Sequence, residues 1–76
     1  MDARHYDPIK LKRIREERRI TQSALARQLD VERQTISRAE RGKNVPYELL
    51  CDISAVLDFE VITLLYPRPL DQASGR

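Results

Sequence analysis

Residues 21–43, TQSALARQLDVERQTISRAERGK, decide the fold because they contain two short helical patterns separated by only a few residues. Thr21 precedes the first pattern as a candidate N-cap, and the apolar residues that follow fall on one face of a helix. Asp30 interrupts this pattern, and a second apolar face runs from Val31 through Ile36. A connection of about three or four residues is the length that a helix-turn-helix uses. The stretch therefore predicts two short helices joined by a tight turn.

The second of these helices carries polar side chains that suit the edges of DNA bases. Arginine and glutamine can each make two hydrogen bonds to one base edge in a major groove, and a small hydroxyl permits close approach. These side chains lie between the apolar positions, so we expect them to face solvent. The residues alone therefore favour a sequence-specific double-stranded DNA-binding protein, whose candidate base-reading residues are Arg33, Gln34, Ser37 and Arg38.

Length and composition exclude several classes of function. A chain of 76 residues is expected to form one domain. No apolar run is long enough for a membrane helix, and the first 20 residues lack the pattern of a signal peptide. A single cysteine fits a reducing cytoplasm, and one His with one Cys supplies too few ligands for structural zinc. We therefore expect a cytoplasmic protein that binds no membrane and no metal.

Catalysis and cofactor binding are not expected either. Two glycines are too few for a phosphate-cradling loop, and the sequence contains no P-loop or dinucleotide fingerprint. Nucleophilic catalysis would need Cys51 or a serine paired with His5, which lies in the predicted N-terminal arm. The sequence therefore predicts a protein that is not an enzyme and uses no cofactor.

Charge is divided unevenly along the chain. Residues 1–43 hold 12 Lys and Arg against 7 Asp and Glu, whereas residues 44–76 hold 2 against 5. A basic half and an acidic, apolar half suggest one face for a polyanion and another for protein contact. An ordinary solvated surface is the alternative explanation of the same charges.

Helical patterns also occur on both sides of the central stretch. We expect helices over about 9–19, 46–57 and 60–65, although the β-branched residues of the last segment also favour a strand. In the first of these helices, Ile9 is expected on the buried side. No glycine closes this helix, so Arg19 is expected to adopt a strained left-handed conformation.

The predicted organisation is one domain between two flexible ends. Residues 1–7 are expected to form a flexible arm, residues 8–66 the domain and residues 67–76 a flexible tail. Gly42 stands where a helix ending near residue 41 would need a left-handed residue.

The stretch from Leu11 to Leu65 resembles the lambda-repressor-like helix-turn-helix domain of phage repressor, Cro and Xre regulators. The resemblance rests on the block T-Q-x-x-L-A at 21–26, followed at a fixed distance by I-S-x-x-E-R-G-K at 36–43. It implies a compact, all-α domain of five helices with the helix-turn-helix at helices 2 and 3. It also implies binding to DNA as a homodimer, with helix 3 (about 32–41) in the major groove.

The resemblance implies roles for residues outside the base-reading set. Arg15 and Glu40 look like the family's internal ion pair, which ties the first helix to the third. Gln22 is similar to the residue that contacts a phosphate and supports the recognition helix. The implied set of phosphate-contacting residues is Thr21, Gln22, Lys43 and Asn44.

The sequence departs from the family pattern at four positions. Arg19, Asp30 and Asp58 stand where family members often carry glycine. Glu32 stands where a Ser or Thr cap is usual, so this carboxylate either accepts a hydrogen bond from cytosine or repels phosphate.

The last apolar stretch holds more hydrophobic side chains than a short terminal helix needs for a core. Part of it is therefore a candidate surface for self-association, and the alternative is that all of it is core. The candidate dimer residues are Phe59, Val61, Ile62 and Leu65.

Two functions from different classes fit these observations. The first is a small homodimeric transcriptional regulator, a repressor bound to an inverted-repeat operator with half-sites about 34 Å apart. The second is a protein-interaction module, such as an antitoxin that neutralises a partner protein, with DNA binding secondary. The polar cluster on the second helix favours the first, and the acidic C-terminal half supports the second. A net charge of +2 disfavours a generic nucleic-acid compactor.

Overall fold

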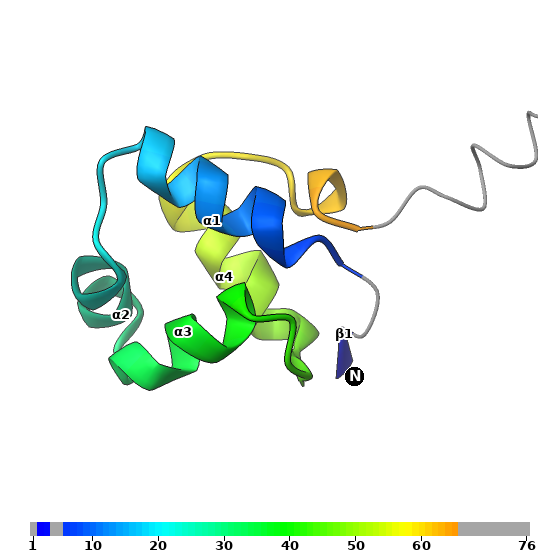
Figure 1. Ribbon diagram of the computed structural model, residues 1–76, viewed down its shortest axis with the longest axis horizontal. Coiled ribbons are helices and arrows are strands. Elements are labelled where there is room, and N and C mark those ends of the chain that lie inside the picture. Colours follow the sequence, from blue (N-terminus) through cyan, green and yellow to red (C-terminus); the bar gives the residue numbers. More distant parts are fainter. Residues whose placement is uncertain (1, 4–5, 66–76) are drawn as a thin grey trace, which may run out of the picture.

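The computed structural model describes residues 2–3 and 6–65, and these form four α-helices around one core (Figure 1). Figure 1 shows α1 in front of α4, with α3 running below them and α2 beside α3. The helices are α1 (Pro8–Glu17), α2 (Gln22–Leu29), α3 (Arg33–Glu40) and α4 (Tyr47–Leu57). A 3₁₀ turn and two short strands complete the fold: η1 (Val61–Thr63), β1 (Asp2–Ala3) and β2 (Val45–Pro46).

The mainly helical class is confirmed, but the expected count of five helices was wrong. The described residues contain four α-helices, and the segment expected to form a helix over 60–65 makes only the single turn η1. All three residues of η1 are β-branched, and such side chains lose rotamer freedom in a helix. No side chain caps the start of this turn at Glu60.

The chain ends differ in what can be described. β1 pairs antiparallel with β2, with Asp2 opposite Pro46, and Tyr6 is only 3 % exposed. The predicted arm 1–7 thus includes residues that contact the domain. The sequence did not indicate the β1–β2 pairing, because two residues are too few to show the alternating pattern of a strand. The predicted tail 67–76 lies outside the described residues. The division into arm, domain and tail stays a prediction.

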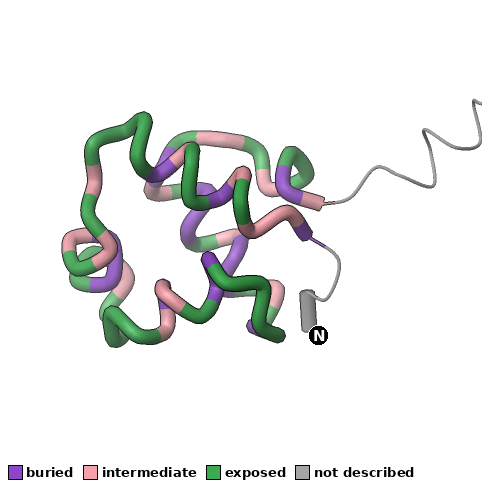
Figure 2. The backbone as a smooth tube through the Cα atoms, in the orientation of Figure 1, coloured by how far each residue is buried: buried purple, intermediate pink, exposed green. Residues whose placement is uncertain are grey.

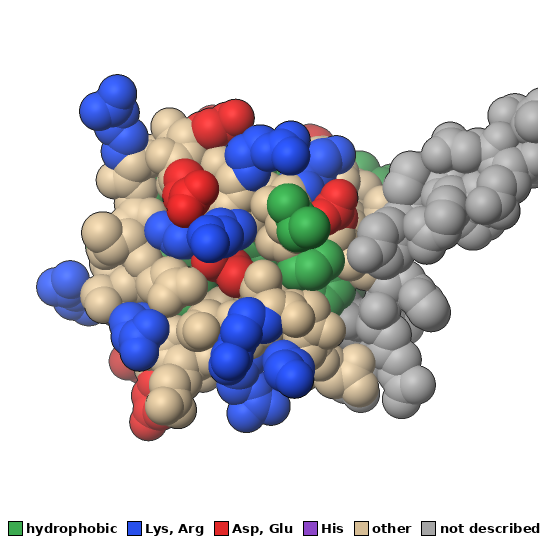
Figure 3. All heavy atoms as spheres, viewed as in Figure 1, with side chains coloured by type: hydrophobic (Ala, Val, Ile, Leu, Met, Phe, Trp, Pro, Cys, Tyr) green, Lys and Arg blue, Asp and Glu red, His purple; other side chains and the backbone are tan. Residues whose placement is uncertain are grey.

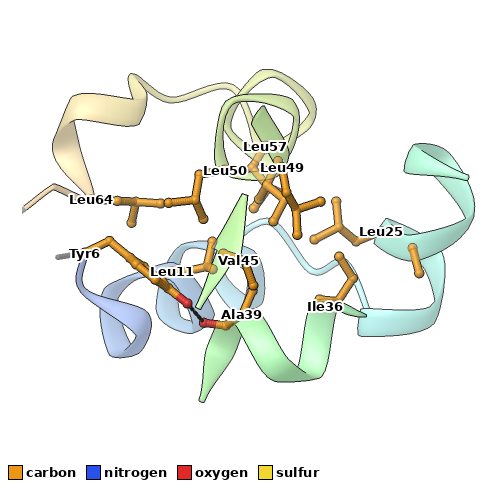
Figure 4. Packing of buried hydrophobic residues seen from close by; sticks show 12 residues of the cluster. Tyr6, Leu11, Leu25, Ile36, Ala39, Val45, Leu49, Leu50, Leu57 and Leu64 are labelled. Atoms are coloured by element: carbon orange, nitrogen blue, oxygen red, sulfur yellow. Dashed lines mark hydrogen bonds between the residues drawn. The ribbon is translucent and has the colours of Figure 1, made fainter. Parts of the chain in front are cut away.

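One apolar cluster joins the four α-helices (Figure 4). Figure 2 shows the buried residues on the inner sides of the helices and the exposed residues on the outer turns. α4 contributes more buried residues than any other helix. The cluster consists of Tyr6, Leu11, Leu25, Ala26, Ile36, Ala39, Val45, Leu49, Leu50, Ile53, Leu57 and Leu64.

The expectation that Ile9 is buried was wrong, since it is 70 % exposed. The buried residues of α1 are Leu11 and Arg15, which are four positions apart and share one face. Ile9 precedes Leu11 by two positions, which is about 200° of rotation, so it faces away from the core.

Each α-helix is followed by a residue in the left-handed region. These residues are Arg19 (φ 59°), Asp30 (φ 59°), Gly42 (φ 80°) and Asp58 (φ 62°). At the end of α1, the amide of Arg19 donates to Glu16 and that of Ile20 to Arg15, the hydrogen-bond pair of a Schellman motif. Glycine adopts this conformation freely and aspartate tolerates it, whereas arginine has no such advantage. The positive φ of Arg19 confirms the left-handed conformation expected from the sequence.

We predict that Arg19→Gly raises the free energy of unfolding by about 1 kcal/mol, because glycine has no Cβ to strain at positive φ. Urea denaturation would measure the change. Arg19→Ala is the matched control, since it removes the same side chain but keeps the Cβ, and it should give no gain. Equal stabilisation by both variants would show that the backbone conformation is not the cause.

Candidate nucleic-acid interface

α3 turns one side to the core and the other to solvent. Its buried residues are Ile36, Ala39 and Glu40. With about 100° of rotation per residue, the predicted base-reading residues occupy an arc of about 140° on the other side of the helix. Three of them are exposed and Ser37 is half-buried. The fold thus presents together the four residues Arg33, Gln34, Ser37 and Arg38.

A buried ion pair joins the end of α3 to α1. Arg15 Nε donates to Glu40 Oε2 at 2.5 Å, and Arg15 Nη2 donates to Glu40 Oε1 at 3.1 Å. The two side chains are only 9 % and 3 % exposed. Arg15 Nη1 also donates to the carbonyl of Ile20 at 2.7 Å, in the link between α1 and α2. This bidentate geometry fixes both distance and orientation, so the last turn of α3 is held against α1.

Gln22 connects the same carboxylate to the start of α3. Its Nε2 donates to Glu40 Oε1 at 3.0 Å, and its Oε1 accepts from Arg33 Nη1 at 3.1 Å. A carboxylate only accepts and a guanidinium only donates, so only one orientation of the amide satisfies both neighbours. Gln22 therefore links the two ends of α3 and holds the Arg33 side chain at the edge of the exposed arc.

The other implied phosphate-contacting residues lie at the two ends of this surface. Thr21 caps α2, with its Oγ1 accepting from the amide of Ala24 at 3.0 Å, and it is exposed. Lys43 and Asn44 are exposed in the loop between α3 and β2. The structure places them on the surface, and their contacts with DNA stay a prediction.

Glu32 stands at the N-cap of α3, but its side chain makes no capping hydrogen bond. The carboxylate is exposed at the entrance to the helix. Glutamate is longer than the Ser, Thr, Asp or Asn that reach back to the helix amides, which accounts for the missing cap.

Sequence reasoning missed Arg41 as a member of this surface. Arg41 is exposed and directly follows α3. It is eight positions after Arg33 and four after Ser37, so helical rotation brings it to about the middle of the exposed arc. The four-residue spacing from Ser37 was the signal that could have found it.

Charges on the surface follow the division seen in the sequence. Figure 3 shows Lys and Arg side chains over α1 and around the C-terminal end of α3, with a few carboxylates between them. In contrast, the described residues after Lys43 include no Lys or Arg. The pKa of Tyr47 is raised above its ordinary value, mainly by a hydrogen bond with Cys51, so its phenol adds no negative charge to this half. The exposed acidic residues of this second half are Glu48, Asp52, Asp58 and Glu60.

The fold and this surface define a DNA-binding helix-turn-helix domain. A helix-turn-helix family model matches residues 11–64, which include α2, α3 and the whole hydrogen-bond network around Glu40. The chain belongs to this family, whose members are the lambda-repressor, Cro and Xre-like proteins. Searches of curated proteins and of solved structures gave no significant match. Within the described residues, every helix is too short or too polar to cross a membrane.

We predict that Glu40→Ala lowers the free energy of unfolding by about 3 kcal/mol, because it leaves the buried guanidinium of Arg15 without its counter-charge. The midpoint of urea denaturation would report the loss. Glu16→Ala removes an exposed carboxylate from α1 and should change stability by less than about 0.5 kcal/mol. An unchanged midpoint for Glu40→Ala would rule out the ion pair as a support of α3.

Proposed function

We propose that the protein is a sequence-specific double-stranded DNA-binding regulator that inserts α3 into the major groove. The observation that carries this proposal is the exposed arc of α3, on which two arginines, a glutamine and a serine lie together. Ile36 and Ala39 attach the opposite side of the helix to the core. A helix held in this way can present one face to base edges without rotating.

The side chains of the arc suit particular bases. The Gln34 amide can donate to and accept from adenine N6 and N7, and an arginine can donate twice to guanine O6 and N7. Each such pair discriminates against a wrong base by about 1–3 kcal/mol. Arg33 is already oriented by Gln22, so part of the ordering that a base contact requires is present before DNA binds.

Polar and positively charged residues at the ends of α3 and at the start of α2 would contact the DNA backbone. Lys43 lies in the loop after α3, Arg41 at the end of α3, and Thr21 and Gln22 at the start of α2. Contacts of this kind set the register of the protein on DNA and make the affinity depend on salt. They supply affinity for all sequences and leave discrimination to α3.

The second part of the proposal is that the protein acts as a homodimer and represses by occupying promoter DNA. Ile62 is 69 % exposed, and it is flanked in the chain by three half-buried apolar residues, two before it and one after it. An exposed patch of this kind fits a second copy, and a two-fold axis would place the two α3 helices on half-sites about 34 Å apart. The proposed dimer surface consists of Phe59, Val61, Ile62 and Leu65.

The direct test is fluorescence anisotropy with duplexes selected by the protein from a random pool and with scrambled duplexes, at two salt concentrations. A preference of about a thousandfold or more at moderate salt is expected. Equal, weak and steeply salt-dependent binding to both duplexes would contradict the proposal. The exposed acidic residues of the second half would then favour the other candidate, a protein-interaction module such as an antitoxin.

Two variants divide the interface into its parts. Gln34→Ala should lose about 1–3 kcal/mol on the selected duplex and relax the preference at one base pair, because it removes only a base contact. Lys43→Ala should weaken binding to all sequences alike and lower the salt slope by about 1, because it removes a phosphate contact. The assignments would be reversed if Lys43→Ala changed the preferred sequence and Gln34→Ala did not.

We predict that Ile62→Glu abolishes dimer formation while the domain stays folded. The exposed side chain packs little within the chain, whereas a charge at the centre of the dimer surface would be buried without a partner. Sedimentation equilibrium would report the mass. Ile9→Glu serves as the control and should leave the dimer intact, because Ile9 is the other large exposed hydrophobic residue within 6–65. A dimeric Ile62→Glu protein would place the interface elsewhere.

A further inference from the structure

The segment before α1 contributes a buried tyrosine to the end of α3 (Figure 4). The Tyr6 hydroxyl donates to the carbonyl of Ala39 at 2.6 Å, and it lies 3.1 Å from the carbonyl of Lys43. Ala39 belongs to the last turns of α3, and Lys43 lies in the loop that follows. One hydroxyl group therefore connects the helix to its loop.

The loop itself has a defined shape. The amide of Lys43 donates to the carbonyl of Arg38 at 3.1 Å, and the amide of Gly42 donates to Ala39 at 3.3 Å. Pro8 packs on the loop so closely that a Cβ at Gly42 would lie 3.3 Å from its Cγ. The residues just before and at the start of α1 thus cover the turn from which the Lys43 side chain projects.

Tyr6 is held in place from its other side as well. Its backbone forms an antiparallel bridge with Leu65, and the amide of Asp7 donates to the carbonyl of Leu64 at 2.8 Å. Tyr6 as a whole residue is 3 % exposed and belongs to the core. The hydroxyl therefore has a fixed position against which the end of α3 and its loop can be aligned.

We propose that Tyr6 is a positioning residue for Lys43 in the loop after α3, and that it tunes DNA affinity without touching DNA. The inference rests on the proposed function, because it concerns the phosphate contacts of this loop. The Tyr6 hydroxyl, shared between the carbonyls of Ala39 and Lys43, restrains the backbone that carries the lysine side chain. Without it, the loop must be ordered when DNA binds, which lowers affinity for every sequence alike.

The test is Tyr6→Phe, which keeps the buried ring and removes only the hydroxyl. Its affinity for selected and scrambled duplexes should fall by the same factor, about threefold to tenfold, so that the preference between them is unchanged. Tyr47→Phe, which removes the hydroxyl of a half-buried tyrosine on α4, is the matched control and should bind normally. Unchanged affinity of Tyr6→Phe would overturn the inference.

A double-mutant cycle with Lys43→Ala separates positioning from a general loss of structure. If Tyr6 acts through Lys43, Tyr6→Phe should cause little further loss of affinity in the Lys43→Ala protein. Equal losses in both backgrounds would overturn the inference. Circular dichroism verifies that all four proteins are folded, and a lower temperature is used if Tyr6→Phe is partly unfolded. If Lys43→Ala alone binds normally, the proposed phosphate contact fails, which is a separate outcome from a failure of Tyr6→Phe alone.

Discussion

The carboxylate of Glu40 is the group on which the arrangement of the first three helices depends. It lies in the last turn of α3 and accepts hydrogen bonds from Arg15 of α1 and from Gln22 of α2. A buried carboxylate is tolerated only where such donors replace water, since its desolvation is unfavourable by several kcal/mol. The packing angle of α3 against α1 and α2 is therefore restricted to the one that satisfies this group. This packing determines the direction in which the exposed arc of α3 faces.

The two ends of α3 are held by different means, and the difference matches their proposed tasks. At the start, Gln22 orients Arg33, a side chain that would read a base. At the end, the Tyr6 hydroxyl and the positive φ of Gly42 shape the backbone of a loop that would meet phosphates. Base discrimination needs precise side-chain placement, whereas a phosphate contact needs mainly a positive charge close to the DNA backbone. Both gain from order that exists before DNA arrives.

The sequence predicts the parts of this molecule that are local. Helical periodicity places α1 and α4 to within two residues, and the lack of a glycine after α1 correctly predicts the left-handed Arg19. Contacts between residues far apart in the chain produce no periodic pattern in the sequence, so they could not be predicted from it. Tyr6 meets Ala39 across 33 positions, and the pairing of β1 with β2 involves two residues on each side. The Arg15–Glu40 pair was implied only by the family resemblance, because no local rule joins residues 25 positions apart.

The role of α3 in DNA recognition is tested most directly by a map of DNA contacts on the folded protein. Amide resonances would be followed by NMR during titration with a duplex selected from a random pool. If α3 is the recognition element, the largest shift changes occur from Arg33 to Arg38, in the loop of Lys43 and Asn44, and at the start of α2, with α4 little affected. Changes confined to the acidic surface of α4, or no changes with any duplex, would contradict the claim that α3 is the recognition element.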